Sequence, residues 1–189
     1  MMITWIHDSR KIAWPPSFDQ KVEIFYQRVL GWQLHIADLI SNGGKPMSHE
    51  PNIADISSVP HSGFAVLQIC LSYFEMVAQY QRKKPKTTDS EDFKAGVHAV
   101  FPALSKGNQA DVDAFLAMLY KNARCGLYHS SMTRDGVGLG QPGHGVAMAF
   151  FPSHKQLVID PHILPKALNP NNKELRQKFE AMFDKDNGL

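Results

Sequence analysis

Arg124 and His129 are the residues of this chain whose types and spacing best suit chemistry, and both lie in the stretch KNARCGLYHSS at 121–131. A histidine titrates near neutral pH, so it can take the proton from an RNA 2′-hydroxyl or protonate a leaving oxygen. An arginine can hold a phosphate with a fork of N–H donors and stabilise the extra charge of the transition state. The pair therefore predicts RNA cleavage that needs no metal ion, and we expect no cofactor.

The spacing of the two residues sets a geometric condition. In an unbroken α-helix, side chains five positions apart point about 140° away from each other, because each residue turns the helix by about 100°. Arg124 and His129 can meet only if the helix bends or a second chain completes the site. Gly126, which lies between them, is the candidate for such a bend.

The segment R-C-G-L-Y-H at 124–129 resembles the Arg-x4–6-His motif of HEPN domains. These are helical bundles found as RNA-cleaving toxins, as RNases of defence systems and as partners of small nucleotidyltransferases. The resemblance covers about residues 18–135 by helix order, with the motif at the end of a late helix as in that family. It implies that Arg124 binds phosphate, that His129 is catalytic, and that two motifs face each other across a homodimer groove. It also implies an RNA substrate and a nucleotidyltransferase or antitoxin partner.

Three further residues are candidates for supporting roles. Glu75 lies near the apolar face of a predicted helix, where a carboxylate needs a partner; it can pair with Arg124 and hold it in place. Cys125 and Tyr128 lie inside the motif itself. Cys125 departs from the family pattern, in which a polar residue such as Asn, Asp or His usually follows the arginine.

Two other interpretations of the motif stay open. In the first, Arg124 caps the last carbonyls of its helix and His129 is a surface residue. In the second, the chain keeps a HEPN-like fold but acts as a non-catalytic interaction or nucleotide-binding module.

A cysteine hydrolase is a minor alternative. Cys125, His144 and Asp160 follow the Cys–His–Asp order of papain-like and acyltransferase sites. Such cysteines normally lie at a helix N-terminus, where the helix dipole lowers the thiol pKa. Cys125 instead follows a predicted helix, which disfavours this chemistry.

Other local signals predict ordinary roles. Gly136-x-Gly138-x-Gly140 has no preceding strand and no Lys-Ser/Thr, so it fits neither a dinucleotide-binding loop nor a P-loop. His144, His154 and His162 lack metal-ligand spacing, and we expect them to be surface residues without a metal.

Composition limits the class of protein. The 189 residues carry a net charge of +2 and are 43% apolar and 20% charged, as expected of a globular protein with one sizeable core. Two distant cysteines do not make a disulfide scaffold. We find no signal peptide and no run of about 20 apolar residues, so we expect a cytoplasmic protein that does not span a membrane.

Apolar residues at steps of three and four predict several helices. Ser17 and Gln20 form a predicted capping box, and Asn108 is a predicted N-cap. The helices are expected from Ser17 to Asn42, His61 to about Arg82, Ser90 to about Leu104, and Asn108 into the motif, with a last helix from about Asn169.

Two β-prone runs at 146–151 and 156–160 predict a hairpin that packs on the bundle. The glycine-rich segment 135–145 is predicted to be a mobile loop that borders the motif. The fold class is therefore mainly α: a HEPN-like helical bundle of four to five helices with a C-terminal β-hairpin. We expect one domain over 1–189, with a helical core at about 18–135 and the hairpin and last helix at about 145–185.

Overall fold

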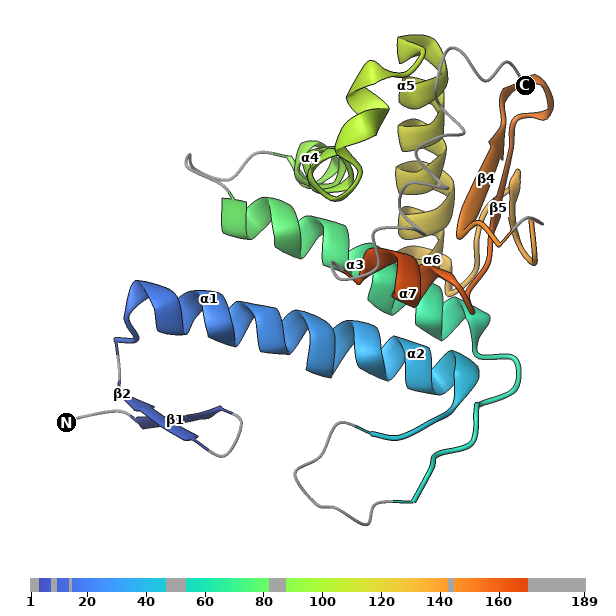
Figure 1. The fold of residues 1–189 in the computed structure, drawn as a ribbon. Helices are drawn as coiled ribbons and strands as arrows, with labels where there is room; N and C mark the ends of the chain where they lie inside the picture. Colours follow the sequence, from blue (N-terminus) through green and yellow to red (C-terminus); the bar gives the residue numbers. More distant parts are fainter. Residues whose placement is uncertain are drawn as a thin grey trace.

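A computed structural model of the chain describes residues 4–7, 10–13, 15–46, 54–81, 88–142 and 145–169. It is mainly helical, with a small sheet late in the chain (Figure 1), which confirms the predicted mainly α class with a hairpin. The α-helices are α1 (Phe18–Gln27), α2 (His35–Asn42), α3 (Gly63–Gln81), α4 (Asp89–Val100), α5 (Gln109–Met118), α6 (Cys125–Ser130) and α7 (Leu164–Leu168).

The first long rod is α1 and α2 joined through a π-helical segment, η1 (Arg28–Leu34). It begins at the predicted capping box, in which Gln20 N donates to Ser17 Oγ at 3.2 Å and Ser17 N donates to Gln20 Oε1 at 2.9 Å. The buried residues of η1 are Val29 and Leu34, which lie five positions apart. This spacing matches the wider turn of a π-helix.

In the first predicted helix, the apolar residues at steps of three and four include Val29, Trp32 and Ile36. The π-helical step explains why this predicted apolar stripe is only partly right. Trp32 is 62% exposed and Ile36 is 41% exposed, although a regular α-helix would have placed both on the buried face. The guanidinium of Arg28 lies 5.5 Å from the centroid of the Trp32 ring. A stripe counted at steps of three and four fails wherever the backbone changes its period.

Helix α3 runs through the centre of the bundle and packs most extensively on α4 (Figure 1). Phe74, Phe93 and Phe101 form an aromatic cluster between them, with Phe74 and Phe93 in edge-to-face contact at 5.6 Å. Helix α4 ends at Val100, before the predicted Leu104, because the chain enters a 3₁₀ turn, η2 (Pro102–Lys106). Proline supplies no N–H for continuing an α-helix.

The second long rod carries the motif. Asn108 caps it as predicted, with Oδ1 accepting a hydrogen bond from Ala110 N at 3.0 Å. Helix α5 continues through a π-helical segment, η3 (Leu119–Arg124), into α6, which ends at Ser131 in the left-handed conformation. The motif thus lies inside a continuous helical run, and the predicted break at Gly126 does not occur.

The late sheet has three strands in the order β3-β5-β4: β3 (Val137–Leu139), β4 (Met148–Phe151) and β5 (Gln156–Ile159). Strands β4 and β5 form the predicted antiparallel hairpin. The hairpin packs on the bundle as expected, with the ring of Phe150 6.0 Å from that of Phe115 on α5. A short 3₁₀ turn, η4 (Pro152–His154), joins the two strands.

The prediction of a mobile loop at 135–145 is wrong for part of its length. Val137–Leu139 pairs in parallel with β5. Two hydrogen bonds fix the approach to this strand: Arg134 N donates to Asn122 O at 2.8 Å, and Asn122 Nδ2 donates to Asp135 O at 2.8 Å. The glycine content of a short segment does not reveal such contacts with distant residues, so it predicted a mobile loop.

The two ends of the chain differ from the simple expectation. At the start, β1 (Thr4–His7) and β2 (Arg10–Ala13) form an antiparallel pair that was not predicted. Near the end, the short α7 was missed, whereas the last helix expected from about Asn169 falls outside the described residues. Within the described ranges, none of the helices combines the length and apolar character needed to cross a bilayer.

Candidate functional site

The two predicted partners, Arg124 and Glu75, form an ion pair between the second rod and α3. Arg124 Nε donates to Glu75 Oε1 at 2.7 Å, and Nη2 donates to Oε2 at 3.1 Å. Both side chains are mostly buried, with 17% and 19% exposed. The pair sits in a hollow of about 410 Å³ that we call the Arg124 hollow, lined by Ala65, Gln68, Ile69, Leu71, Ser72, Glu75, Arg124, Leu127 and Tyr128.

Aromatic rings connect Arg124 with His129. The guanidinium carbon lies 4.9 Å from the Tyr128 centroid and 5.8 Å from the Tyr120 centroid, within the range of cation–π attraction. The ring of Tyr128 meets that of His129 edge-on at 5.3 Å. Both motif residues therefore contact Tyr128, which is 67% exposed, and His129 is exposed on the same helix.

The guanidinium keeps donors for a ligand. Burial alone would lower the pKa of Arg124, but the hydrogen bonds and negative charge of Glu75 outweigh it and raise this pKa, so the group stays cationic. Glu75 occupies Nε and Nη2; within the described ranges no residue accepts a hydrogen bond from Nη1. Of the five N–H donors of Arg124, Glu75 accepts from two, so three remain for an anion.

Gly126 has a role other than the predicted bend. A Cβ on this residue would lie 2.6 Å from the carbonyl oxygen of Met132 and 3.1 Å from Arg134 N, closer than such contacts normally come. The glycine lets the chain after α6 fold back against the helix. Arg124 also does not cap carbonyls at the end of its helix, since its guanidinium bonds Glu75.

The residues of the cysteine-hydrolase alternative are placed unequally. Cys125 is half-buried within the continuous helical run and lies beside Tyr120. Burial of the Tyr120 hydroxyl raises its pKa, and the neighbouring Cys125 adds to this effect. Asp160 is buried, and its Oδ1 accepts a hydrogen bond from His162 N at 2.8 Å. His144 falls outside the described residues.

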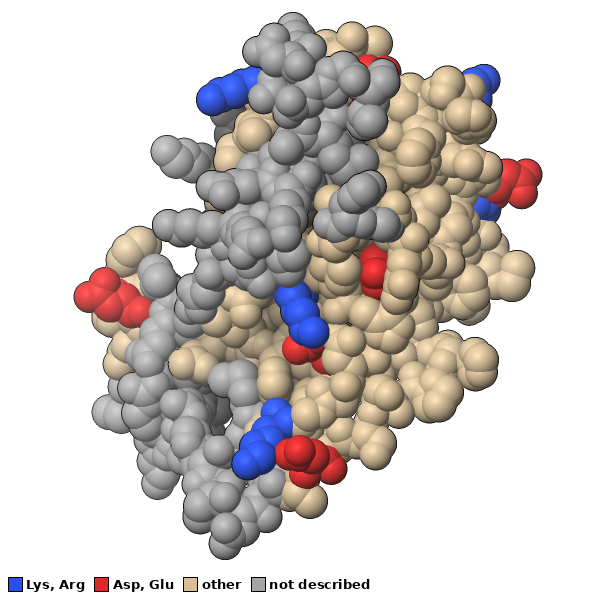
Figure 2. Space-filling view, turned by 45° about the vertical axis from the view of Figure 1, so that its right-hand side comes forward, with Lys and Arg blue, Asp and Glu red and all other residues tan. Residues whose placement is uncertain are grey.

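Surface charge gives little guidance to the site. On the face drawn in Figure 2, lysine and arginine side chains are scattered, some beside acidic ones, and the described residues form no continuous basic strip there.

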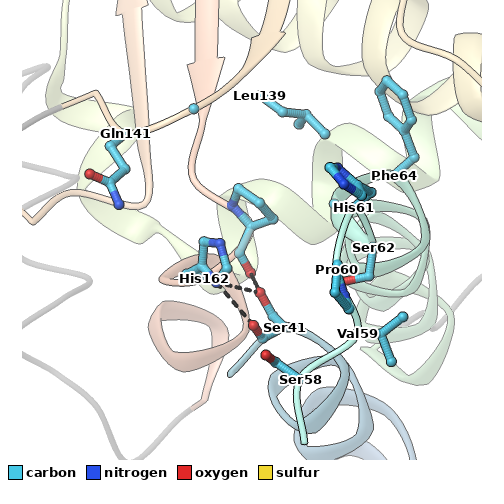
Figure 3. Close-up of a pocket in the computed structure, with 13 residues that line it drawn as sticks. Ser41, Ser58, Val59, Pro60, His61, Ser62, Phe64, Leu139, Gln141 and His162 are labelled. Carbon is cyan, nitrogen blue, oxygen red and sulfur yellow. Dashed lines mark hydrogen bonds between the residues drawn. The ribbon is translucent and has the colours of Figure 1, made fainter. Parts of the chain in front are cut away.

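A second hollow, of about 620 Å³, was not predicted. We call it the His162 hollow; the residues that line it are Ser41, Ser58, Val59, Pro60, His61, Ser62, Gly63, Phe64, Leu139, Gly140, Gln141, Pro161 and His162 (Figure 3). The described end of the glycine-rich segment borders this hollow and not the Arg124 hollow, contrary to expectation. No local pattern predicts this hollow, because two of the residues that line it, Ser41 and His162, lie 121 positions apart.

Comparison with known proteins finds no matching family model, no similar curated protein and no similar solved structure. The HEPN resemblance therefore rests on the motif and the helix order.

The ion pair should stabilise the fold measurably. In a double-mutant cycle of Glu75→Gln and Arg124→Gln, we expect a coupling free energy of about 1–2 kcal/mol, because two charge-assisted hydrogen bonds are lost from a mostly buried place. Urea unfolding of the four proteins measures it. A coupling near zero would contradict a structural link between α3 and the motif helix.

Proposed function

We propose that this chain is an RNA-binding protein of the HEPN type that cleaves RNA without a metal ion. The observation that carries the proposal is the arrangement at the Arg124 hollow. Arg124 is held by Glu75 with three N–H donors left over, and Tyr128 contacts both Arg124 and His129. Each group matches one need of the reaction: a phosphate ligand, an aromatic surface for a base, and a group that transfers protons.

The reaction is a transesterification within the RNA. His129 removes the proton of the 2′-hydroxyl, and the 2′-oxygen attacks the adjacent phosphorus. The phosphorus–O5′ bond breaks, and the O5′ leaving group takes up a proton. Arg124 stabilises the added negative charge on the non-bridging oxygens. The products are a 2′,3′-cyclic phosphate and a free 5′-hydroxyl.

A second copy of the motif would supply the second proton-transfer group. One chain offers one motif histidine, whereas the reaction removes one proton and delivers another. A two-fold dimer brings a second His129 to the same groove. Tyr128 and His129 lie on the exposed side of α6, where another chain can approach them.

The dimer gives a direct prediction. We expect sedimentation equilibrium to show a dimer at tens of micromolar, a concentration at which a specific dimer with a micromolar Kd is mostly assembled. Tyr128→Glu, which adds a charge to the exposed side of α6, should weaken it, whereas Lys155→Glu in the hairpin turn serves as the matched control. A monomer at this concentration would argue against the two-fold site.

Cleavage itself is tested with purified protein in EDTA. Single-stranded RNA should be cut to fragments that end in 2′,3′-cyclic phosphate, identified by mass spectrometry. The same strand with 2′-deoxy substitution at every position should stay intact because it lacks the nucleophile. Cleavage that depends on added Mg²⁺, or cleavage of the deoxy strand, would contradict the mechanism.

The second candidate is a non-catalytic HEPN-like module that binds a protein partner, such as a nucleotidyltransferase or an antitoxin. Two observations favour it: Glu75 neutralises the charge of Arg124, and Trp32 and Ile36 expose apolar surface on the first rod. RNA that binds but is never cut, together with partner binding lost in Trp32→Ala, would support this alternative.

A further inference from the structure

The His162 hollow contains a histidine whose ring is anchored on one edge only. Figure 3 shows this edge of His162 turned toward Ser41. Nδ1 lies 3.1 Å from Ser41 O, 3.2 Å from Asn42 Oδ1 and 2.9 Å from Ser41 Oγ. A backbone carbonyl oxygen can only accept a hydrogen bond, so Nδ1 must carry the proton.

The orientation of the Asn42 amide supports the same assignment. Asn42 Nδ2 donates to Asp38 Oδ1 at 2.6 Å and to His162 O at 2.9 Å. Both are acceptors, which fixes the nitrogen on that side and leaves Oδ1 to accept from His162 Nδ1. Asp38 Oδ1 also lies 3.7 Å from Lys166 Nζ, so these contacts connect the Asn42 amide with α7.

In the neutral ring, Nε2 is then the atom with the lone pair. Within the described residues, no group hydrogen-bonds to it. The direction of the hydrogen bond between His162 Nδ1 and Ser41 Oγ also excludes Ser41 as a nucleophile activated by His162. Ser41 is buried, and its hydroxyl donates to Pro161 O at 3.0 Å, so it accepts from Nδ1–H rather than giving up a proton to it.

The lining of the hollow limits the class of ligand. The described residues that line it include no Asp, Glu, Lys or Arg, which favours a ligand that needs no salt bridge. Phe64, Leu139 and Val59 offer apolar surface, while Gln141 offers a donor and an acceptor. A volume of about 620 Å³ falls in the usual range for small-molecule sites.

His61 stands on another wall of the hollow from His162 (Figure 3). Its φ of 60° lies in the left-handed region, which is strained for a residue other than glycine. The fold tolerates this strain at a residue that faces the hollow, as binding sites often do.

We propose that the His162 hollow binds a nucleoside, with the base against the apolar wall of Phe64 and Leu139 and a ribose hydroxyl donating to His162 Nε2. The choice of a nucleoside as the ligand rests on the proposed function. The tautomer of His162 follows from its hydrogen bonds alone. Phe64 and Gln68 lie about 6 Å apart along the axis of α3. Phe64 lines the His162 hollow and Gln68 lines the Arg124 hollow. An RNA strand along α3 can therefore reach both.

The test is a titration of the histidine ring signals by ¹H–¹⁵N NMR, with adenosine and uridine as probes and inorganic phosphate in parallel. In the free protein, His162 should show the Nδ1-protonated tautomer. One of the nucleosides should then shift His162 and His61 saturably below about 5 mM, the weak end of specific binding. The same shifts should appear in Arg124→Ala, since Arg124 does not line this hollow.

His162→Asn is the matched variant, because an asparagine amide nitrogen can replace Nδ1 as the donor to Ser41 O but offers nothing in place of Nε2. It should keep the fold and weaken nucleoside binding about tenfold. Binding that is unchanged in His162→Asn, or no saturable shift with either nucleoside, would overturn the proposal. Phosphate that shifts His162 and His61 as tightly as a nucleoside would also overturn it. Nucleoside binding without any RNA cleavage would support this site and count against the proposed function alone.

Discussion

His129→Ala is expected to lower the rate of metal-free RNA cleavage by about 10²–10⁴-fold, the usual contribution of a general acid–base group. Among the motif side chains, the imidazole is the one suited to general acid–base proton transfer. His129 is exposed, and its ring contacts the ring of Tyr128, so its loss should change stability by less than about 0.5 kcal/mol. The single-turnover rate on a short RNA measures the effect.

Arg124→Ala should cost a comparable factor of about 10²–10³ by removing the donors that face the transition-state charge. Arg124→Lys should recover little, because an ammonium cannot both pair with Glu75 through a planar fork and keep donors for the phosphate. Arg124→Ala also leaves Glu75 unpaired, so its fold must be checked by its unfolding curve. The double variant with Glu75→Gln removes that stray charge and should remain inactive.

Matched controls separate the motif from its surroundings. His154→Ala removes an exposed histidine from the turn between β4 and β5, and Lys121→Ala removes an exposed cation from the motif rod; neither residue lines the Arg124 hollow. Both variants should cleave at the rate of the parent protein. If His154→Ala falls as far as His129→Ala, the histidine effect is not specific to the motif.

Cys125→Ser distinguishes the two enzymatic hypotheses. Under the RNase mechanism the thiol transfers no proton, so the variant should retain cleavage. Under the cysteine-hydrolase alternative the nucleophile is lost, and activity on an activated ester should vanish. Loss of RNA cleavage in Cys125→Ser with an intact fold would contradict the assignment of chemistry to Arg124 and His129.

The features predicted correctly from the sequence are mostly local. The capping box at Ser17 and the N-cap at Asn108 each depend on residues two or three positions apart, so a short stretch contains the whole interaction. The β4–β5 hairpin depends on one turn between two apolar runs. The pairing of Glu75 with Arg124 spans 49 positions, and it was predicted because a carboxylate on an apolar face needs a partner.

The features that were missed depend on backbone periodicity or on distant partners. No pattern of residues predicts the π-helical segment η1, which exposes Trp32, or η3, which ends at Arg124. Such segments are often found at functional sites. His162 was predicted to be a surface residue, and it is exposed. The contacts that fix its ring were not predicted, because Ser41 and Asn42 lie about 120 positions earlier.

Gly96→Ala is expected to destabilise the protein by about 2–4 kcal/mol, although alanine is the better helix former by about 1 kcal/mol. Gly96 is buried in α4 where it crosses α3. A Cβ at this position would lie 1.8 Å from the carbonyl oxygen of Phe74 and 2.5 Å from its carbonyl carbon. Backbone atoms cannot rotate away as a side chain can, so the two helices must separate.

That separation acts on the densest part of the core. Phe74 is fully buried and meets the ring of Phe93 on α4, so moving α4 outward opens gaps around both rings. Overpacking of this kind typically costs 1–3 kcal/mol, occasionally more, and the lost contacts add to it. Helix propensity alone predicts a gain, so the sign of the change is the decisive result.

Two controls accompany Gly96→Ala in urea unfolding. Ala95→Gly, at the exposed neighbouring position of α4, should lose about 1 kcal/mol through helix propensity alone. Gly138→Ala should change little, because nothing lies within 4 Å of the added Cβ. If Gly96→Ala is as stable as the parent protein or more so, then α3 and α4 do not cross at the distance described. The described packing of Phe74 against Phe93 and Phe101 would then be wrong. The position of α3, whose Glu75 binds Arg124, would then be in question as well.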